Sequence, residues 1–219
     1  QHYISNNIVN PDIVLCFIYG IKIVLPMYLV VFTVGGICEA IFAIVRKHEI
    51  NEGFLVTGFL IPLTMPPNIP LAMLAVATIF GVIIGKEIFG GTGYNIFNPA
   101  LTARAFLFFA YPNKMSGQSP WISTGVDGVS KATPLLETSS STIMPDNLSW
   151  FNMFYGEDLK NILSYDWSDM FYGFIPGSIG ETSTLAILIG AFILLITKIG
   201  NWRTICAIFI GMFATSCLL

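Results

Sequence analysis

The sequence predicts an all-α polytopic membrane protein in which full spanning helices alternate with broken, half-length helices. First, 54% of the 219 residues are hydrophobic and 11% are charged, whereas soluble domains carry roughly 25% charged residues. Second, the mean hydropathy is +0.74. Third, apolar runs of helical length are separated by turns rich in glycine and proline, and twenty glycines suit helices that pack closely in lipid.

The first spanning helix is predicted at residues 23–45. This run is apolar apart from Glu39 and is followed at once by Arg46. Its length of about 35 Å is sufficient to cross a bilayer with some tilt. The preceding run, residues 13–21, is too short to span and ends at Lys22, so it is expected to form a half-helix or an interfacial stretch.

A broken hairpin is predicted next. Residues 54–63 are apolar, the proline-rich segment 65–70 interrupts them, and residues 71–84 resume the apolar pattern until Lys86. Such a break exposes backbone amides and carbonyls. At membrane depth those groups are expected to line a cavity walled by protein.

The remaining chain alternates between polar segments and apolar helices. A glycine-rich turn at 90–99 precedes an apolar helix at 100–110, and a long polar stretch covers residues 113–182. A further spanning helix is predicted at residues 183–197, and another apolar helix begins at residue 205 and runs to residue 219. Residues 1–219 are interpreted as one membrane domain, a central portion of a longer protein, because the sequence opens with Gln and ends inside an apolar run.

The distribution of charge predicts the orientation. The basic residues in short connections fall on one side, which is assigned to the cytoplasm: Arg46, Lys47, Lys86, Lys198 and Arg203. The 113–182 stretch holds three lysines against eight acidic residues and is predicted to be an extracytoplasmic loop. The hairpin at 54–84 then crosses outward and back, and the 100–110 helix crosses outward again.

Composition also excludes several classes of site. The net charge of −3, with no basic run, argues against nucleic-acid binding. The four cysteines lie apart in apolar stretches, so zinc, disulfide or iron–sulfur sites are not expected. No glycine-rich NADH-binding unit is present, and no catalytic residue or metal site is predicted.

The strongest local signal runs from Asp127 to Thr133, with the sequence Asp-Gly-Val-Ser-Lys-Ala-Thr. It resembles D-x-x-[S/T]-G-A-[T/S], the acceptor of flavin transferases, which esterify the phosphate of FMN to the final hydroxyl. Lys131 stands where glycine is usual. In this pattern Asp127, Ser130 and Ala132 would be recognised by the transferase. The competing interpretation is an ordinary loop rich in serine and threonine.

Four longer blocks resemble the NqrB family, the B subunits of the Na⁺-translocating NADH:quinone oxidoreductases. They occur in the family's order and cover residues 34–39, 46–53, 85–112 and 177–183. The RnfD subunit of the Rnf ferredoxin complex shares the acceptor and the Gly-Glu-Thr-Ser block. Its sequence differs after Asn-Pro-Ala, where this chain has residues 104–112, and this difference favours the quinone-reducing family.

The resemblance implies two flavins on a broken-helix, urea-transporter-like scaffold. Thr133 would carry FMN through a phosphoester bond. Non-covalent riboflavin would bind beside Asn95 and Asn98, whose amides suit the donors and acceptors of a flavin's pyrimidine edge. The alternative for Asn98, ahead of Pro99, is helix capping, and both roles are compatible.

The resemblance also implies a quinone and ion region at Gly35, Gly36 and Glu39, with ubiquinone or menaquinone as substrate and Na⁺ as the transported ion. These residues share a helical face, and a carboxylate inside an apolar span usually marks an ion path, a partner or a polar cavity. The alternative is that the glycines pack helices while Glu39 snorkels toward Arg46.

Three further residues remain open to more than one interpretation. Glu181 and Thr182 either belong to the N-terminal cap of the following helix or lie near the FMN, whose phosphate would suit a helix N-terminus. Arg104 either pairs with a phosphate, pairs with Glu39, or does neither.

The resulting hypothesis is a multi-pass subunit of the bacterial inner membrane that passes electrons from FMN through riboflavin to quinone and is not catalytic alone. Its expected partners are the lipid bilayer, a flavin transferase and the other subunits of the Nqr-type complex, including the second covalent-FMN subunit and the NADH/FAD subunit. The alternatives are an RnfD-type subunit and a urea-type channel without redox function.

Overall fold

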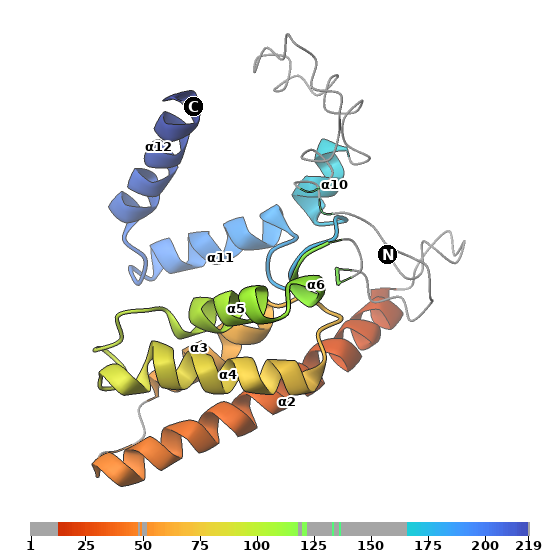
Figure 1. The fold of residues 1–219 in the computed structure, drawn as a ribbon. Coiled ribbons are helices and arrows are strands. Elements are labelled where there is room, and N and C mark those ends of the chain that lie inside the picture. Colours follow the sequence, from red (N-terminus) through yellow and green to blue (C-terminus); the bar gives the residue numbers. More distant parts are fainter. Residues whose placement is uncertain are drawn as a thin grey trace.

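The computed structural model describes residues 13–47, 49, 52–117, 120, 121, 133, 136 and 166–218. Within these residues the fold is entirely helical (Figure 1). The elements in chain order are α2 (Ile13–Arg46), α3 (Gly53–Leu63), α4 (Leu71–Gly85), η1 (Glu87–Phe89), α5 (Pro99–Ala110), α6 (Pro112–Met115), α10 (Trp167–Tyr172), α11 (Thr184–Ile196) and α12 (Trp202–Leu218).

Helix α2 corrects the prediction for residues 13–21. That segment is the start of a single continuous helix of 34 residues, about 51 Å long, which passes through Lys22 and contains Pro26. The charge of Lys22 therefore does not end a helix. A long lysine side chain can lie along an apolar helix and carry its ammonium outward, so one charge is compatible with helix continuation.

Two described helices are long and apolar enough to cross a membrane, at Val14–Arg46 and Leu71–Phe89. The other apolar helices are shorter, including Gly53–Leu63 and Pro99–Ala110. Helix α11, at 13 residues, is about 20 Å long and is too short to cross a bilayer core of about 30 Å alone, contrary to the prediction of a spanning helix there.

The bundle core lies between α2, α3, α4 and α5, where α4 packs on both α2 and α5. Buried apolar side chains from all four helices fill it, among them Val31, Ile61, Leu74 and Leu107. Helices α4 and α5 approach closely at Gly81, where an added methyl group would lie 2.6 Å from the carbonyl oxygen of Pro99. Small residues thus permit the close helix contact that lipid-embedded packing requires.

The predicted break between α3 and α4 is confirmed, and two of its freed carbonyl groups are paired with amides of the protein. The carbonyl oxygens of Leu63 and Met65 accept hydrogen bonds from the amides of Gly180 and Ile179, at 2.9 and 3.2 Å. The 179–180 segment, more than a hundred residues away in sequence, therefore forms hydrogen bonds with the end of α3. This satisfies the requirement for paired backbone groups at membrane depth.

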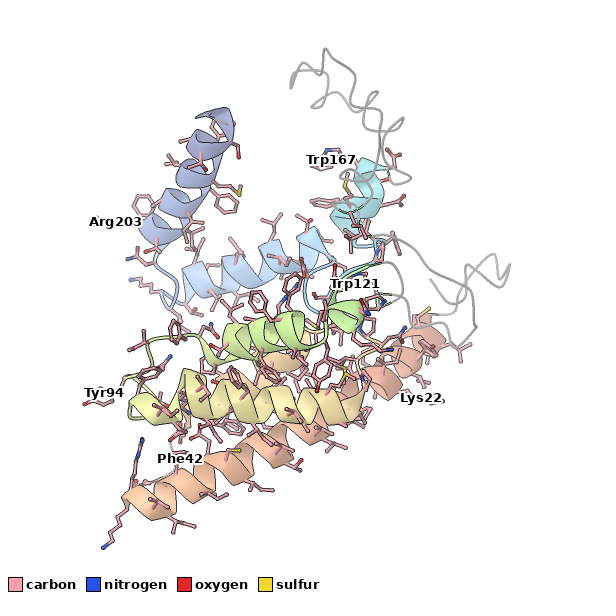
Figure 2. The ribbon with its side chains drawn as sticks, in the orientation of Figure 1. Lys22, Phe42, Tyr94, Trp121, Trp167 and Arg203 are labelled. Carbon is pink, nitrogen blue, oxygen red and sulfur yellow. The ribbon has the colours of Figure 1, made fainter. Side chains whose placement is uncertain are left out.

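The basic ends of the helices gather at one end of the molecule, as predicted. Figure 1 shows the C-terminal ends of α2 and α4, the loop before α5, and the turn between α11 and α12 at the same end. Figure 2 shows Phe42, Tyr94 and Arg203 toward this end and Lys22, Trp121 and Trp167 toward the other. The assignment of this end to the cytoplasm remains a prediction.

Candidate functional site

Helix α5 has a cavity at each end. The cavity at its N-terminal end has a volume of about 290 Å³ and is lined by Asn95, Asn98, Lys86 and residues of α3. The cavity toward its C-terminal end has a volume of about 380 Å³ and is lined by Thr133, Arg104 and Phe108 together with the 175–182 segment. Asn98 and Phe108 are separated by about 15 Å along the helix axis.

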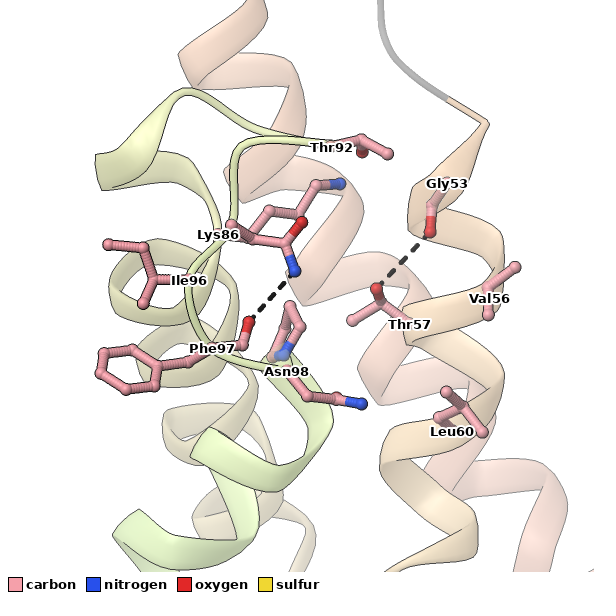
Figure 3. A pocket seen from close by; sticks show the side chains of 11 residues that line it. Gly53, Val56, Thr57, Leu60, Lys86, Thr92, Ile96, Phe97 and Asn98 are labelled. Atoms are coloured by element: carbon pink, nitrogen blue, oxygen red, sulfur yellow. Dashed lines mark hydrogen bonds between the residues drawn. The ribbon is translucent and has the colours of Figure 1, made fainter. Parts of the chain in front are cut away.

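The two asparagines of the first cavity use only part of their hydrogen-bonding capacity for local structure. The side-chain oxygen of Asn98 accepts from the amides of Ala100 and Leu101, at 3.0 and 3.4 Å, so the predicted N-cap with Pro99 at the first helical position is confirmed. The cap leaves the Asn98 amide nitrogen as a donor, and this nitrogen points toward α3 (Figure 3). Asn95 Nδ2 donates to the Phe97 carbonyl oxygen at 3.1 Å, which leaves the Asn95 side-chain oxygen as an acceptor.

Glu39 does not snorkel toward Arg46. It is 4% exposed, and its Oε1 contacts the ammonium of Lys86 directly. Arg46 instead lies with its Nη1 3.9 Å from Oε2 of Glu87. Lys86, which the orientation prediction counted as a loop charge, is itself buried. The pairing arises because residue 86 follows α4 directly and α4 packs against α2.

Gly35 is a packing glycine. A methyl group added there would lie 2.7 Å from two ring atoms of Phe54 and 3.3 Å from Thr78, so α2 is held close to both α3 and α4. At Gly36 the nearest ring atom of Phe54 would be an ordinary 3.8 Å away. Neither of the two cavities is lined by Gly35, Gly36 or Glu39.

Thr133 lies at the second cavity with Glu181 and Thr182, so the structure brings together three of the residues predicted to surround an FMN. The Thr133 side chain is half-buried, and its hydroxyl oxygen accepts a hydrogen bond from the amide of Leu136 at 3.3 Å. Asp127, Ser130 and Ala132, the other members of the acceptor pattern, lie outside the described residues.

Arg104 pairs with neither Glu39 nor any acid of the bundle core. Its Nη1 donates to the Thr64 carbonyl oxygen at 3.0 Å and to the hydroxyl of the buried Ser178 at 3.2 Å. The same nitrogen lies 3.6 Å from Oε2 of Glu181, which is largely exposed. Arg104 therefore joins α5 to the end of α3 and to the 178–181 segment while its guanidinium borders the Thr133 cavity.

Ser183 is the cap of α11. Its side-chain oxygen accepts a hydrogen bond from the amide of Ala186 at 3.3 Å, so the helix cap in the 177–183 block is formed by Ser183. Glu181 and Thr182 precede the cap and border the cavity. The cap is thus formed by Ser183, and the nearness of Glu181 and Thr182 to an FMN remains a prediction.

Sequence reasoning missed the buried positions of Lys86 and Glu87. The signal that marks them is the position of two adjacent charges directly after the apolar run 71–84, because ionisable groups in such segments need partners. Their partners come from α2, more than forty residues earlier.

Comparison with known proteins decides the family. The sequence profile of the NQR2, RnfD, RnfE family matches residues 8–219. The chain belongs to this family. The NQR2, RnfD, RnfE membership and the apolar helices together identify a polytopic membrane protein.

Curated relatives are named as the B subunit of the Na⁺-translocating NADH-quinone reductase. The protein from Chromohalobacter salexigens is 51% identical over 92% of this chain and 45% of its own length. The protein from Ectopseudomonas mendocina is 50% identical over 93% of this chain and 46% of its own length. The protein from Yersinia pestis is 51% identical over 91% of this chain and 45% of its own length. The chain thus spans less than half the length of these relatives.

Proposed function

We propose that this chain is the flavin-bearing part of an electron-transfer subunit in a Na⁺-translocating NADH:quinone oxidoreductase of the bacterial inner membrane. The observation that carries the proposal is the pair of cavities on α5, one bordered by Thr133 and the other by Asn95 and Asn98. Flavins bound at these two positions supply the redox chemistry, and the protein supplies their spacing and surroundings.

The Thr133 cavity suits a phosphate ester. An FMN ester adds an anionic phosphodiester next to the threonine, and the guanidinium of Arg104 borders the same cavity. Arginine is well adapted to phosphate because its planar guanidinium presents several N–H donors. The cavity also includes Thr182, one residue before the α11 cap, and the positive end of a helix favours an anion.

The cavity at the other end of α5 suits a flat ring. Its volume of about 290 Å³ is close to the lower end of small-molecule sites, about 300–1,000 Å³. The Asn98 amide nitrogen supplies a donor and the Asn95 side-chain oxygen an acceptor. A flavin's pyrimidine edge presents the complementary groups, so riboflavin is the proposed occupant.

The remaining roles follow from the names of the relatives and from the sequence resemblance. Quinone, either ubiquinone or menaquinone, is assigned to the face of α2 that carries Gly35, Gly36 and Glu39, and Na⁺ is the transported ion. The partners are the other subunits of the complex, including the second covalent-FMN subunit and the NADH/FAD subunit. A flavin transferase would modify Thr133.

An RnfD-type subunit is the second candidate, because the matching family includes RnfD. The naming of the three relatives as the B subunit of the sodium-translocating reductase favours the quinone enzyme. Quinone reductase activity of the assembled complex separates the two.

The decisive experiment measures the covalent flavin. Denatured protein from its native membrane is run on a gel and examined for yellow-green fluorescence, and the peptide containing Thr133 is weighed by mass spectrometry. We expect a fluorescent band and the mass of bound FMN, lost in Thr133→Ala and kept in the control Thr138→Ala. An unmodified peptide from cells that contain the transferase would exclude the flavoprotein and favour a non-redox channel.

A further inference from the structure

Four charged side chains meet between α2 and the end of α4. Lys86 contacts Glu39 and lies with its Nζ 4.0 Å from Oε1 of Glu87, while Arg46 reaches the other oxygen of Glu87. The side chains of Lys86, Glu39 and Glu87 are 3%, 4% and 1% exposed. Removing three charges from water is expensive, and buried ion pairs contribute little net stability. The cluster therefore calls for a role other than holding α2 against α4.

The cluster is asymmetric with respect to the Asn95–Asn98 cavity. Lys86 lines this cavity, whereas Glu39 and Glu87 do not. Figure 3 shows the Lys86 side chain extending into the space between the loop before α5 and α3. The positive end of the Lys86–Glu39 pair is thus presented to the cavity, and the negative end lies behind it on α2.

Lys86 is held in this position by more than one contact. Glu39 contacts its ammonium directly, Glu87 lies 4.0 Å away, and the ring of Phe54 has its centroid 5.9 Å from Nζ. Oε2 of Glu87 accepts no hydrogen bond and lies 3.9 Å from Arg46, whereas Oε1 is the oxygen that lies 4.0 Å from Lys86. If Glu39 loses its charge, Glu87 can still hold the ammonium in place.

We propose that the positive charge of Lys86 sets the reduction potential of the ring bound beside Asn95 and Asn98, and that Glu39 tunes that potential through Lys86. The proposal rests on the proposed function, which assigns riboflavin to this cavity. Reduction adds negative charge to a flavin ring, and a cation near its pyrimidine edge favours the reduced form. Glu39, on the face assigned to quinone, is thereby coupled electrostatically to the flavin cavity.

Neutralising the two residues of the pair one at a time should shift the midpoint potential of the flavin in opposite directions. Lys86→Gln removes the cation next to the ring, so the flavin should become harder to reduce and its midpoint potential more negative. Glu39→Gln leaves the cation less compensated, so the midpoint potential should become more positive. We expect at least a tenfold change in the reduction equilibrium in each case, about 30 mV for a two-electron couple and about 59 mV for a one-electron couple.

The experiment is a spectroelectrochemical titration of the purified complex, with its non-covalent flavin quantified after acid extraction. Glu52→Gln is the control, because Glu52 is exposed at the start of α3 and does not line the cavity. The double variant Glu39→Gln/Lys86→Gln removes one charge of each sign and leaves Glu87 with Arg46, so it avoids an unpaired buried charge. Its potential should lie between those of the single variants.

A more negative potential in Lys86→Gln together with a more positive one in Glu39→Gln supports the inference, and opposite shifts in the reverse directions overturn it. Shifts of the same sign, or potentials that equal the control's, overturn it while leaving riboflavin binding intact. If Lys86→Gln does not assemble, the sign of the Glu39→Gln shift decides: a positive shift supports the coupling, and no shift or a negative one overturns it. A wild-type complex that releases no riboflavin would instead overturn the proposed function.

Discussion

Arg104 donates a hydrogen bond from Nη1 to the carbonyl oxygen of Thr64 at 3.0 Å, and this bond joins the middle of α5 to the end of the broken helix α3. The same guanidinium borders the cavity that contains Thr133. One side chain therefore satisfies a backbone group freed by the helix break and supplies positive charge where a flavin phosphate is proposed.

Replacing Arg104 is expected to destabilise the fold. Arg104→Met removes the charge-assisted bonds to Thr64 and Ser178, so the free energy of unfolding should fall by about 1.5–3 kcal/mol. The measurement is the Tm of the detergent-purified protein. Arg203→Met is the matched control, because it also removes a guanidinium but from an exposed position on α12. The guanidinium carbon of Arg203 lies 5.8 Å from the centroid of the neighbouring Trp202 ring. Equal Tm values for the two variants would contradict the structural role of Arg104.

The close approach of α4 and α5 predicts an unfavourable effect of a single methyl group. In Gly81→Ala the new Cβ would lie 2.6 Å from the Pro99 carbonyl oxygen and 2.8 Å from the Ala103 side chain, so the helices must separate. Overpacking of this kind costs about 1–3 kcal/mol. The control is Gly190→Ala on α11, where the added Cβ meets nothing within 4 Å and should stabilise the helix by about 0.5–1 kcal/mol. A variant at Gly81 that matches or exceeds wild-type Tm would show that this interface is not close-packed.

Asn98 allows its capping and binding roles to be separated. Asn98→Ser keeps a side-chain oxygen that can cap α5, whereas Asn98→Ala removes it and should cost about 1 kcal/mol of stability. Both variants lose the amide nitrogen that points toward α3, so both should lose riboflavin, measured by extraction of non-covalent flavin. Wild-type riboflavin content in Asn98→Ser would limit Asn98 to the cap.

The predictability of the site differs from residue to residue. The cap formed by Asn98 and Pro99 was predictable because capping depends on a side chain and the backbone two or three residues away. The partners of Glu39 and Arg104 were not, because each contact joins residues forty or more positions apart. The prediction of a half-helix or an interfacial stretch at residues 13–21 is wrong, because a single lysine at position 22 does not interrupt helical hydrogen bonding.

The sequence by itself determined the helical class, the break between α3 and α4, the cap at Asn98, and the acceptor pattern that ends at Thr133. These features arise from composition, proline positions and contacts between near neighbours, which do not depend on how the chain returns on itself. Only the tertiary structure decided that Thr133 borders the same cavity as Arg104 and that Lys86 joins Glu39 to the Asn95–Asn98 cavity. Such relationships depend on helix packing, because packing brings charges and cavities together without regard to their separation in sequence.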